Sequence, residues 1–457
     1  MEFTGMLHPK IRTFIITNMH RTIHVIVTIC FLAGASIPLQ AQTNIFSRNA
    51  LRADFQQFRE ILENEHCCLY EYTPKAEMDS LFDAHFQLID HEMKRDEFFM
   101  LLAPITAKIG CMHTAVWMPG RFFVTKPTMM FPLTLKLIDE QVIVSGSYLP
   151  FNEVPHGSIL LEINKKPTEE IIQQLRKIIS ADAQNPYFIN AQMMERFPLL
   201  YTSAFGLPDQ YEIIYLSPGN TKSEIKTLTP TSHESVRQVV FSDFNSPPLD
   251  FEVVNEKNTA IMRVPTFIYY DKVEYFRNFM DSCFHLIKKK GISNLILDIR
   301  GNDGGDPFCS SILLSYLQKS PIPYFAEPYG KYRSLSDPLP IPKDNFNGNL
   351  YTLIDGSCGS TNGHFCALMK YHRIGKFIGT PSGATYKCNA GKDTEFRLIN
   401  TQMIITIGRT TYSAAVTNMA KTAILPDIFV HETHDDFIYY RDVFLETAFE
   451  QIELDNQ

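Results

Sequence analysis

The sequence predicts a mixed protein of α+β and α/β type with several domains, and three observations support this. Apolar residues recur at helical spacing between positions 51 and 105, and they alternate with polar residues between 133 and 144. Beyond Phe251, strand patterns alternate with helix patterns. A chain of 457 residues is long enough for two or three domains. The net charge of −8 gives no reason to expect nucleic acid as a partner.

The first 41 residues have the pattern of a secretory signal peptide. A basic region precedes an apolar core at 23–35, and Ala41 is a small residue where cleavage is expected. Met19 is an alternative start. The apolar core is too short to span a bilayer comfortably. We therefore predict an exported protein, periplasmic or extracellular, with no membrane span after cleavage.

Cysteine spacing indicates no metal site. The chain has nine cysteines, of which Cys30 lies in the predicted signal peptide. Cys67 and Cys68 are adjacent and the others are scattered, so they do not form paired C-x-x-C motifs. Disulfides are compatible with export, but their pairing does not follow from the sequence.

Residues 42–120 are predicted to form an N-terminal helical cap. Apolar residues at helical spacing mark three helices, at 51–62, 78–86 and 98–105. The segment ends in IGCMHTAV at 109–116, where Gly110 permits a tight turn and a strand begins. His113 lies at this junction, where functional groups are common, although a single histidine is more often structural.

Residues 125–230 are predicted to form a β-rich domain. Alternating residues on both sides of Asp139-Glu140 predict a hairpin over 133–144. A helix is expected at 168–179. A second hairpin is expected at 211–215 with its tip at 218–220.

Residues 250–450 alternate strands and helices. A helix lined by apolar residues at 273–287 ends in Lys288-Lys-Lys-Gly291. The apolar strand at 294–300 has the pattern of a fully buried strand and runs into Gly301-Asn-Asp-Gly-Gly-Asp306. Such glycines let backbone N–H groups approach a bound carbonyl, and the lysine of a nucleotide-binding loop does not occur here.

The stretch from Leu350 to Ala384 carries the strongest functional signal. An apolar strand leads into the small, polar run at 355–363, then a helix, then a strand at 376–379. A serine at a helix N-terminus has free backbone N–H groups and the positive end of the helix dipole beside it, and both stabilise an oxyanion. An ordinary strand-to-helix turn is the alternative interpretation.

Four segments, taken in chain order, resemble the C-terminal processing peptidases, a family that includes the tail-specific proteases and the tricorn catalytic core. IGCMHT at 109–114 resembles the family's IGDGHT, and LDIRGNDGG at 297–305 resembles its strand and loop. Ser360 stands nineteen residues before Gly379, as the family's nucleophile does. ILPDIFV at 424–430 resembles GVxPDixV.

This resemblance implies a ClpP/crotonase-like α/β catalytic domain and a PDZ-like β module. It also implies that Ser360 is the nucleophile and His113 the general base, as in the tricorn-like branch. The N–H groups of Thr361, Gly304 and Gly305 would hold the oxyanion. The implied substrate is a peptide or an unfolded protein, and neither a metal nor an organic cofactor is implied.

The chain departs from the family pattern at several positions. Tail-specific proteases place a lysine base where Thr385 stands, and Lys387 is two residues away. The tricorn-like branch has an acidic residue where this chain has Ala420. Glu395 and Asp427 are acidic residues in the same part of the chain, but no spacing selects either as the partner of the histidine.

Three functions remain open from the sequence. The favoured one is an exported serine endopeptidase. The second is a catalytically weak or inactive homologue that binds peptides through the PDZ-like module. The third has Cys358 as nucleophile with His364 nearby, although one helical turn does not readily direct both side chains at one substrate. The oligomeric state does not follow from the sequence.

Overall fold

The largest sheet has six strands in the order β12-β13-β14-β15-β16-β19, all parallel to their neighbours except β12. Its strands are β12 (Asp250–Val254), β13 (Thr259–Arg263), β14 (Asn294–Asp298), β15 (Asn349–Ile354), β16 (Lys376–Gly379) and β19 (Ile428–Phe429). This is a computed structural model, and it describes residues 45–119, 129–149, 153–232, 249–386, 389–417 and 421–457. The predicted signal peptide, Lys387 and Ala420 lie outside these residues.

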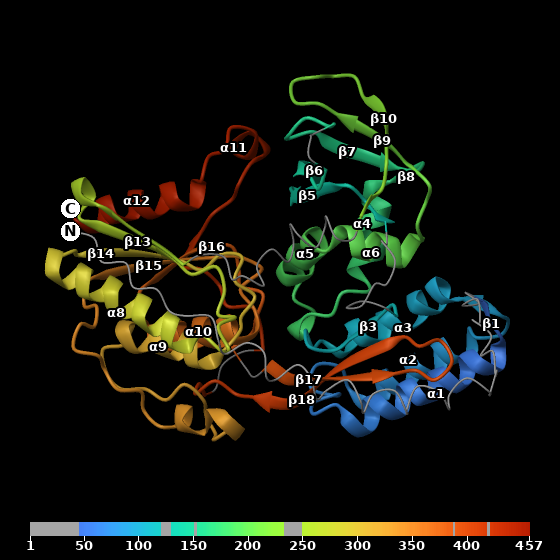
Figure 1. Cartoon of the computed structure of the whole chain (residues 1–457), viewed down its shortest axis with the longest axis horizontal. Helices are drawn as coiled ribbons and strands as arrows, with labels where there is room; N and C mark the ends of the chain where they lie inside the picture. Colours follow the sequence, from blue (N-terminus) through green and yellow to red (C-terminus); the bar gives the residue numbers. More distant parts are fainter. Residues whose placement is uncertain (1–44, 120–128, 150–152, 233–248, 387–388, 418–420) are drawn as a thin grey trace, which may run out of the picture. The chain divides into compact units, whose positions relative to one another are not determined.

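Helices cover both faces of this sheet (Figure 1). One face packs against α8 (Val273–Lys290), α9 (Pro307–Leu317) and α10 (Ser360–Tyr371), and the other against α12 (Val443–Asp455). Along β14, Leu295 and Leu297 belong to the first core and Ile296 to the second. Burial on both sides explains the uninterrupted apolar run of this strand. The predicted helix at 273–287 and its glycine end are confirmed, since Gly291 has a φ of +66°.

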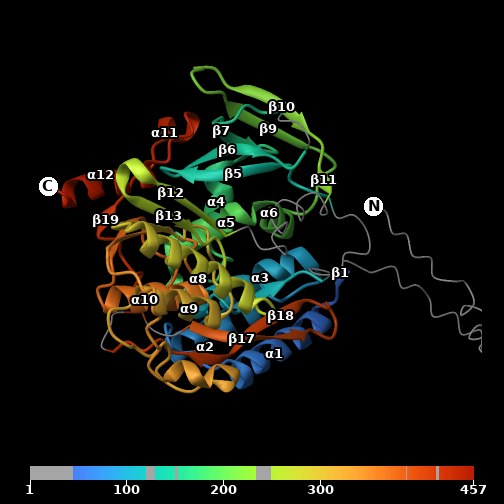
Figure 2. The same cartoon turned by 60° about the vertical axis from the view of Figure 1, so that its left-hand side comes forward.

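A second sheet has the order β10-β9-β7-β6-β5, with β8 paired to β7 (Figure 2). It contains β5 (Leu133–Ile138), β6 (Gln141–Ser147), β7 (Ile159–Ile163), β8 (Lys166–Pro167), β9 (Tyr211–Leu216) and β10 (Glu224–Leu228). Both predicted hairpins are present. Asp139 and Glu140 have φ of +49° and +63°, as a two-residue hairpin turn requires. The likeness of this sheet to a PDZ domain stays a prediction.

The helices that accompany this sheet are α4 (Thr168–Arg176), α5 (Pro186–Glu195) and α6 (Phe197–Phe205). The three predicted N-terminal helices are present as α1 (Arg48–Glu65), α2 (Lys75–Gln87) and α3 (Arg95–Ile109). Phe58, Leu102 and Val144 lie in one hydrophobic core, so these helices and the second sheet are packed together. The predicted boundary between a cap and a β domain stays a prediction.

A third sheet has the order β17-β18-β3 and joins distant parts of the chain. The hairpin of β17 (Asn389–Arg397) and β18 (Ile404–Tyr412) adds β3 (Ala115–Trp117), with Ile405 opposite Val116. The sequence analysis did not identify this hairpin. Asp54 is buried on α1, and its carboxylate accepts the N–H groups of Asn400 and Thr401 at 2.9 and 2.7 Å. The turn of the hairpin is therefore anchored on the first helix.

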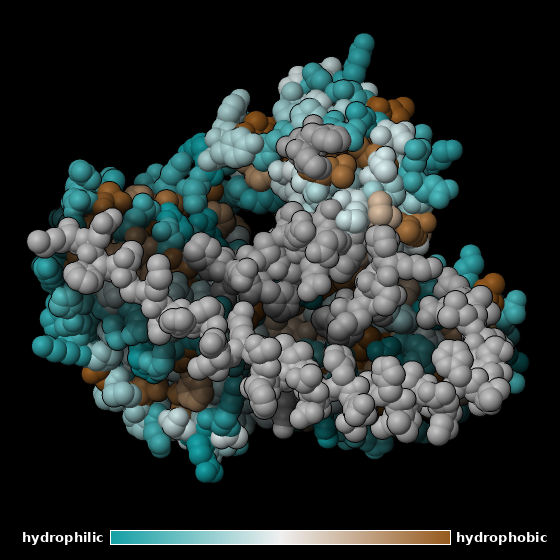
Figure 3. All heavy atoms as spheres, viewed as in Figure 1, coloured by the Kyte–Doolittle hydropathy of each residue, from teal (hydrophilic) through white to brown (hydrophobic). Residues whose placement is uncertain are grey.

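The remaining elements are short. They are β1 (Ile45–Phe46), β2 (Met93–Lys94), β4 (Met129–Met130), β11 (Thr231–Ser232), α11 (His434–Ile438) and the 3₁₀ helices at Asp182–Gln184, Asn255–Lys257 and Gly330–Ser336. On the face shown in Figure 3, apolar side chains of the described residues are scattered among hydrophilic ones. Within the described ranges, no helix is long and apolar enough to cross a membrane.

Candidate active site

Ser360 is the first residue of α10, at the end of the turn that follows β15. Its φ of +47° lies in the left-handed region, which non-glycine residues seldom adopt. Such strain is typical of a serine held on a sharp strand-to-helix turn, where its hydroxyl is presented above the sheet. The backbone places Ser360 at a helix N-terminus, as the sequence predicts.

His113 lies between Ser360 and Asp393. Its Nε2 is 3.2 Å from the Ser360 hydroxyl oxygen, and its Nδ1 is 3.0 Å from Oδ1 of Asp393. In the neutral tautomer that suits both contacts, Nδ1–H donates to the carboxylate and Nε2 accepts the serine proton. The structure thus brings the two residues selected from the sequence together and adds an aspartate that the sequence analysis missed.

The three-stranded sheet places this aspartate. His113 precedes β3, β3 pairs with β18, and Asp393 on β17 is opposite Gly408 on β18. The β-branched run IITI at 404–407 was a strand signal in the sequence. It could have indicated the hairpin, but not which acidic residue of β17 reaches the histidine.

The net effect of the surroundings is to raise the pKa of His113. Burial lowers this pKa, while the hydrogen bond and the charge of Asp393 raise it, with smaller contributions from Asp182 and Asp303. The raising effects prevail, so the site stabilises the imidazolium form that a general base passes through.

Asp182 holds the loop that carries His113. This aspartate is buried, and its Oδ1 accepts the Met112 N–H at 2.9 Å. The next residue, Ala183, donates its N–H to the Gly110 carbonyl at 3.0 Å. Burial raises the pKa of Asp182 to about 6, against the Met112 N–H bond and the charge of His113, which lower it. The Met112 sulfur in turn accepts the Ser360 N–H at 3.3 Å, so Met112 links the segment that carries His113 to the turn that carries Ser360.

The glycine loop after β14 lies against the nucleophile turn. A Cβ on Gly304 would stand 2.8 Å from Cβ of Ser360 and 2.9 Å from the Thr361 nitrogen. The Thr361 hydroxyl donates to the Gly305 carbonyl at 2.7 Å. The Thr361 N–H belongs to the first turn of α10, whose N–H groups have no acceptor within the helix.

The predicted role of Gly304 as an oxyanion donor stays a prediction. Its N–H donates to Oδ1 of Asn302 at 2.9 Å and is therefore occupied. Position 304 requires a glycine, because its φ is +116° and the space that a side chain would need is taken by Ser360 and Thr361.

We expect Gly304→Ala to lower kcat by roughly 10²–10³-fold, the scale of losing an oxyanion contact. The added methyl group would push the loop away from Ser360 and Thr361. Gly291→Ala is the matched control, because Gly291 also has a positive φ of +66° but a Cβ there meets nothing within 4 Å. Steady-state kinetics on both variants, with thermal unfolding, separates the two effects. Equal loss of kcat in both would show that backbone strain, and not the contact with Ser360, matters.

The other acidic residues considered from the sequence are not at the histidine. Glu395 is exposed on β17, two residues beyond Asp393. Asp427 pairs with Lys370 and accepts the Phe377 N–H at 2.8 Å, so it stabilises the large sheet.

Cys358 and His364 have different partners. The Cys358 thiol donates to the Ile299 carbonyl at 3.3 Å, and burial raises the pKa of this thiol. Nε2 of His364 contacts the Tyr412 carbonyl at 3.0 Å, and burial lowers the pKa of this imidazole to about 4. A buried thiol of raised pKa is a poor nucleophile, so this arrangement does not support the cysteine alternative.

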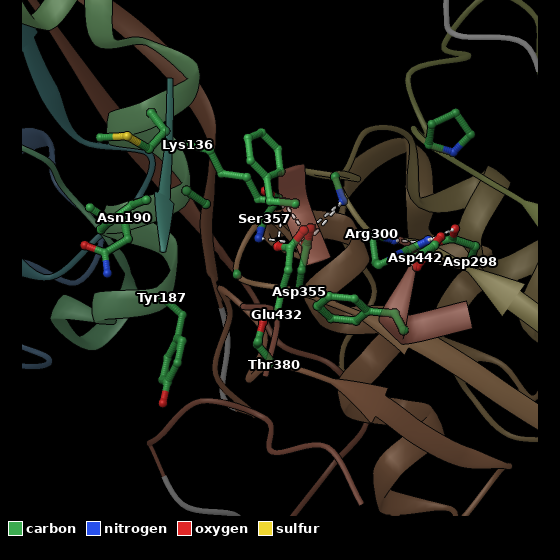
Figure 4. Close-up of a pocket in the computed structure, with 18 of the residues that line it drawn as sticks. Lys136, Tyr187, Asn190, Asp298, Arg300, Asp355, Ser357, Thr380, Glu432 and Asp442 are labelled. Carbon is green, nitrogen blue, oxygen red and sulfur yellow. Dashed lines mark hydrogen bonds and ion pairs between the residues drawn. The ribbon is translucent and has the colours of Figure 1, made fainter. Parts of the chain in front are cut away.

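A cavity of about 860 Å³ adjoins the nucleophile turn (Figure 4). Ser357, three residues before Ser360, lines it together with side chains from two sides. Lys136 and Tyr187 come from the second sheet and α5, and Arg300 comes from the end of β14. Ion pairs stiffen the walls: Arg300 with Asp298 and Asp442 at 2.7 and 2.8 Å, and Lys136 with Glu432 at 2.6 Å.

A serine at a helix N-terminus, a histidine and a carboxylate in hydrogen-bonded series form the arrangement that serine hydrolases use. Residues 258–430 match the model of Peptidase family S41. The resemblance to the C-terminal processing peptidases is thereby confirmed. The chain is also 28% identical over 206 residues to the Tricorn protease homolog of Saccharolobus solfataricus. The aligned region covers 44% of this chain and 17% of that relative.

The fold is similar to two solved structures. One is mature CPAF, with a TM-score of 0.64 and 11% identity, covering 90% of this chain and 97% of that one. The other is mature CPAF complexed with lactacystin, with a TM-score of 0.65 and 10% identity, covering 90% and 98%. The similarity extends well beyond residues 258–430, so the mixed α/β architecture as a whole has a precedent.

Proposed function

We propose that this chain is an exported serine endopeptidase that cleaves peptides or unfolded proteins. The observation that carries the proposal is the series Ser360–His113–Asp393, with 3.2 and 3.0 Å between its members. Ser360 Oγ attacks the peptide carbonyl while His113 Nε2 takes its proton. The imidazolium then returns that proton to the leaving amine, and water hydrolyses the acyl-enzyme by the same steps.

Asp393 orients the imidazole and stabilises its charged form. It fills the role for which the sequence offered no residue, since the family's acidic position is Ala420. For the oxyanion we propose the N–H groups of Thr361 and Gly305. The bond from the Thr361 hydroxyl to the Gly305 carbonyl supports this by holding the two backbone segments together.

The cavity is the proposed substrate site. Its position beside the turn that carries Ser360 supports this. Lys136 and Leu137 of β5 line the cavity, and β5 is an edge strand of its sheet. An edge strand can take an extended peptide as an additional strand, which is how a PDZ-like module would bind it. We therefore propose that substrate enters along β5 toward Ser360.

A fluorophosphonate probe tests the proposal directly. We expect it to label the purified chain at one serine, and peptide mass spectrometry should locate the label on Ser360. Lactacystin, with which mature CPAF was solved, is a second probe. Peptide binding without labelling by either probe would favour the inactive, peptide-binding homologue instead.

Asp182→Ala is expected to lower kcat about 10–100-fold, because loss of a buried acceptor for the Met112 N–H costs about 1–3 kcal/mol. Asp182→Asn is the matched control, since its amide oxygen keeps that acceptor and should restore most of kcat. kcat and KM should be measured separately, because a displaced His113 lowers kcat more than it raises KM. Equal kcat in the two variants and the parent would contradict a positioning role.

Export is proposed from the first 41 residues alone. We expect secretion in a bacterial host to yield a mature chain that begins after Ala41. N-terminal sequencing of the secreted protein checks this. An intact Met1 or Met19 on a cytosolic product would show that the segment is not a signal peptide.

A further inference from the structure

The segment that follows α1 brings three potential metal ligands together. His66, Cys67 and Cys68 each offer one ligand atom, and these atoms all lie within 4.8 Å of one another. None of the three takes part in the proposed peptidase chemistry. The sequence predicts no metal site here, because adjacent cysteines do not have the C-x-x-C spacing of zinc knuckles.

The distances suit a small tetrahedral ion. The two sulfurs are 3.5 Å apart. Zinc–sulfur bonds of about 2.3 Å at a tetrahedral angle place two sulfurs roughly 3.8 Å apart, so the pair needs little movement. The imidazole nitrogen lies within 4.8 Å of both sulfurs. It must approach them by about 1 Å at most to reach the spacing of ligands around a tetrahedral zinc ion.

His66 is in the tautomer that can bind. Its Nδ1 accepts the Cys68 N–H at 3.1 Å, so the lone pair of Nδ1 is directed at the turn that holds the cysteines. The proton is then on Nε2, which is buried and has no partner within the described residues. A metal at Nδ1 would replace the hydrogen bond from the Cys68 N–H.

The turn is rigid and reachable. His66 is 8% exposed and so is fixed by its packing, whereas Cys67 is exposed and gives an ion access. The Cys67 N–H donates to the Gly408 carbonyl at 3.4 Å, and Glu65 pairs with Arg409 at 2.7 Å. These contacts hold the ligands against β18.

We propose that His66, Cys67 and Cys68 form a binding site for a thiophilic cation, Zn²⁺ or Cu⁺. Two thiolates and one imidazole are the donors that these ions prefer, and three protein ligands leave a position for water. Each thiol gives up its proton as the metal–sulfur bond forms. Because Gly408 is opposite Asp393 in the β17–β18 register, the ion would sit beside the strand that orients His113.

Cobalt provides the test, because thiolate ligation to Co²⁺ gives a charge-transfer absorption in the near ultraviolet. The full chain, reduced with a phosphine, is titrated with Co²⁺ and then with Zn²⁺. We expect one equivalent of Co²⁺, displaced by Zn²⁺ as the relative affinities of these ions require. A parallel titration against a chromophoric Cu⁺ chelator shows whether Cu⁺ is the better-bound ion.

Cys67→Ser and Cys68→Ser should each weaken binding by at least about tenfold. Cys283→Ser is the matched control, because Cys283 is buried on α8 in the core of the large sheet and should not affect binding. Protection of Cys67 and Cys68 from alkylation by bound Zn²⁺, read by mass spectrometry on the unaltered chain, needs no variant to fold. A titration without the thiolate band, a band that survives both serine substitutions, or full alkylation in excess Zn²⁺ would each overturn the proposal.

Discussion

Ser360→Ala is expected to lower kcat for peptide hydrolysis by roughly 10⁶-fold, the scale on which triads of this kind lose function. Without the hydroxyl there is no acyl-enzyme, and His113 has no proton to take from the enzyme. The peptide site is untouched, so KM should change little. Single-turnover kinetics, on variant protein quantified by absorbance and parent protein quantified by active-site titration, give the sensitivity that this measurement needs.

His113→Ala should cost about as much as Ser360→Ala, and the double variant little more than either, because members of a catalytic unit fail together. Lys387→Ala is the control and should retain activity, since the structure places a histidine at Ser360. Full activity of His113→Ala together with inactive Lys387→Ala would mean that the chain uses a lysine base after all.

Asp393→Asn should lower kcat by about 10⁴-fold. The amide would donate to Nδ1 and so favour the tautomer with its proton on Nε2, which cannot accept from Ser360. The acid limb of the kcat profile should also move to lower pH. Asp393 raises the pKa of His113, and a base works only when unprotonated, so removing the carboxylate lets it work at lower pH.

Glu395→Gln is the matched control for this variant. It removes one negative charge from the same strand, two residues away, at an exposed position. Ala420→Glu should leave kcat unchanged, because Asp393 already supplies the orienting group. A kcat for Asp393→Asn within a few-fold of the parent would assign that role to another residue.

The parts of the site that the sequence could predict are those determined by neighbouring residues. The buried strand and glycines of β14 place the Gly304 loop, and the strand, turn and helix pattern places Ser360. Asp393 is different. It and Glu395 are two residues apart on β17 and so share one face of the strand. Only the pairing of β18 with β3, about 290 residues distant in sequence, selects Asp393.

The fold also divides into features that local sequence predicts and features that depend on distant contacts. The helix at 273–290 follows from its apolar period and terminal glycine, both local signals. The sharing of one core by α1, the second sheet and β18 depends on packing between residues as distant as Phe58 and Ile405. Such contacts leave no periodic trace in the sequence, so only the structure shows how the predicted regions join.

The anchoring of the β17–β18 turn on Asp54 bears on when the chain can act during its own biogenesis. In the proposed centre, residue 393 supplies the orienting carboxylate, residue 113 the general base and residue 360 the nucleophile. The turn that follows β17 is held by the carboxylate of Asp54, near the start of the described chain. Contacts so distant form late, because the intervening loops must close first. A chain that lacks either end therefore has no complete centre, and residues 258–430 alone lack His113. We therefore expect peptidase activity only after the two ends of the described chain have met, so that an unfinished chain does not cleave itself.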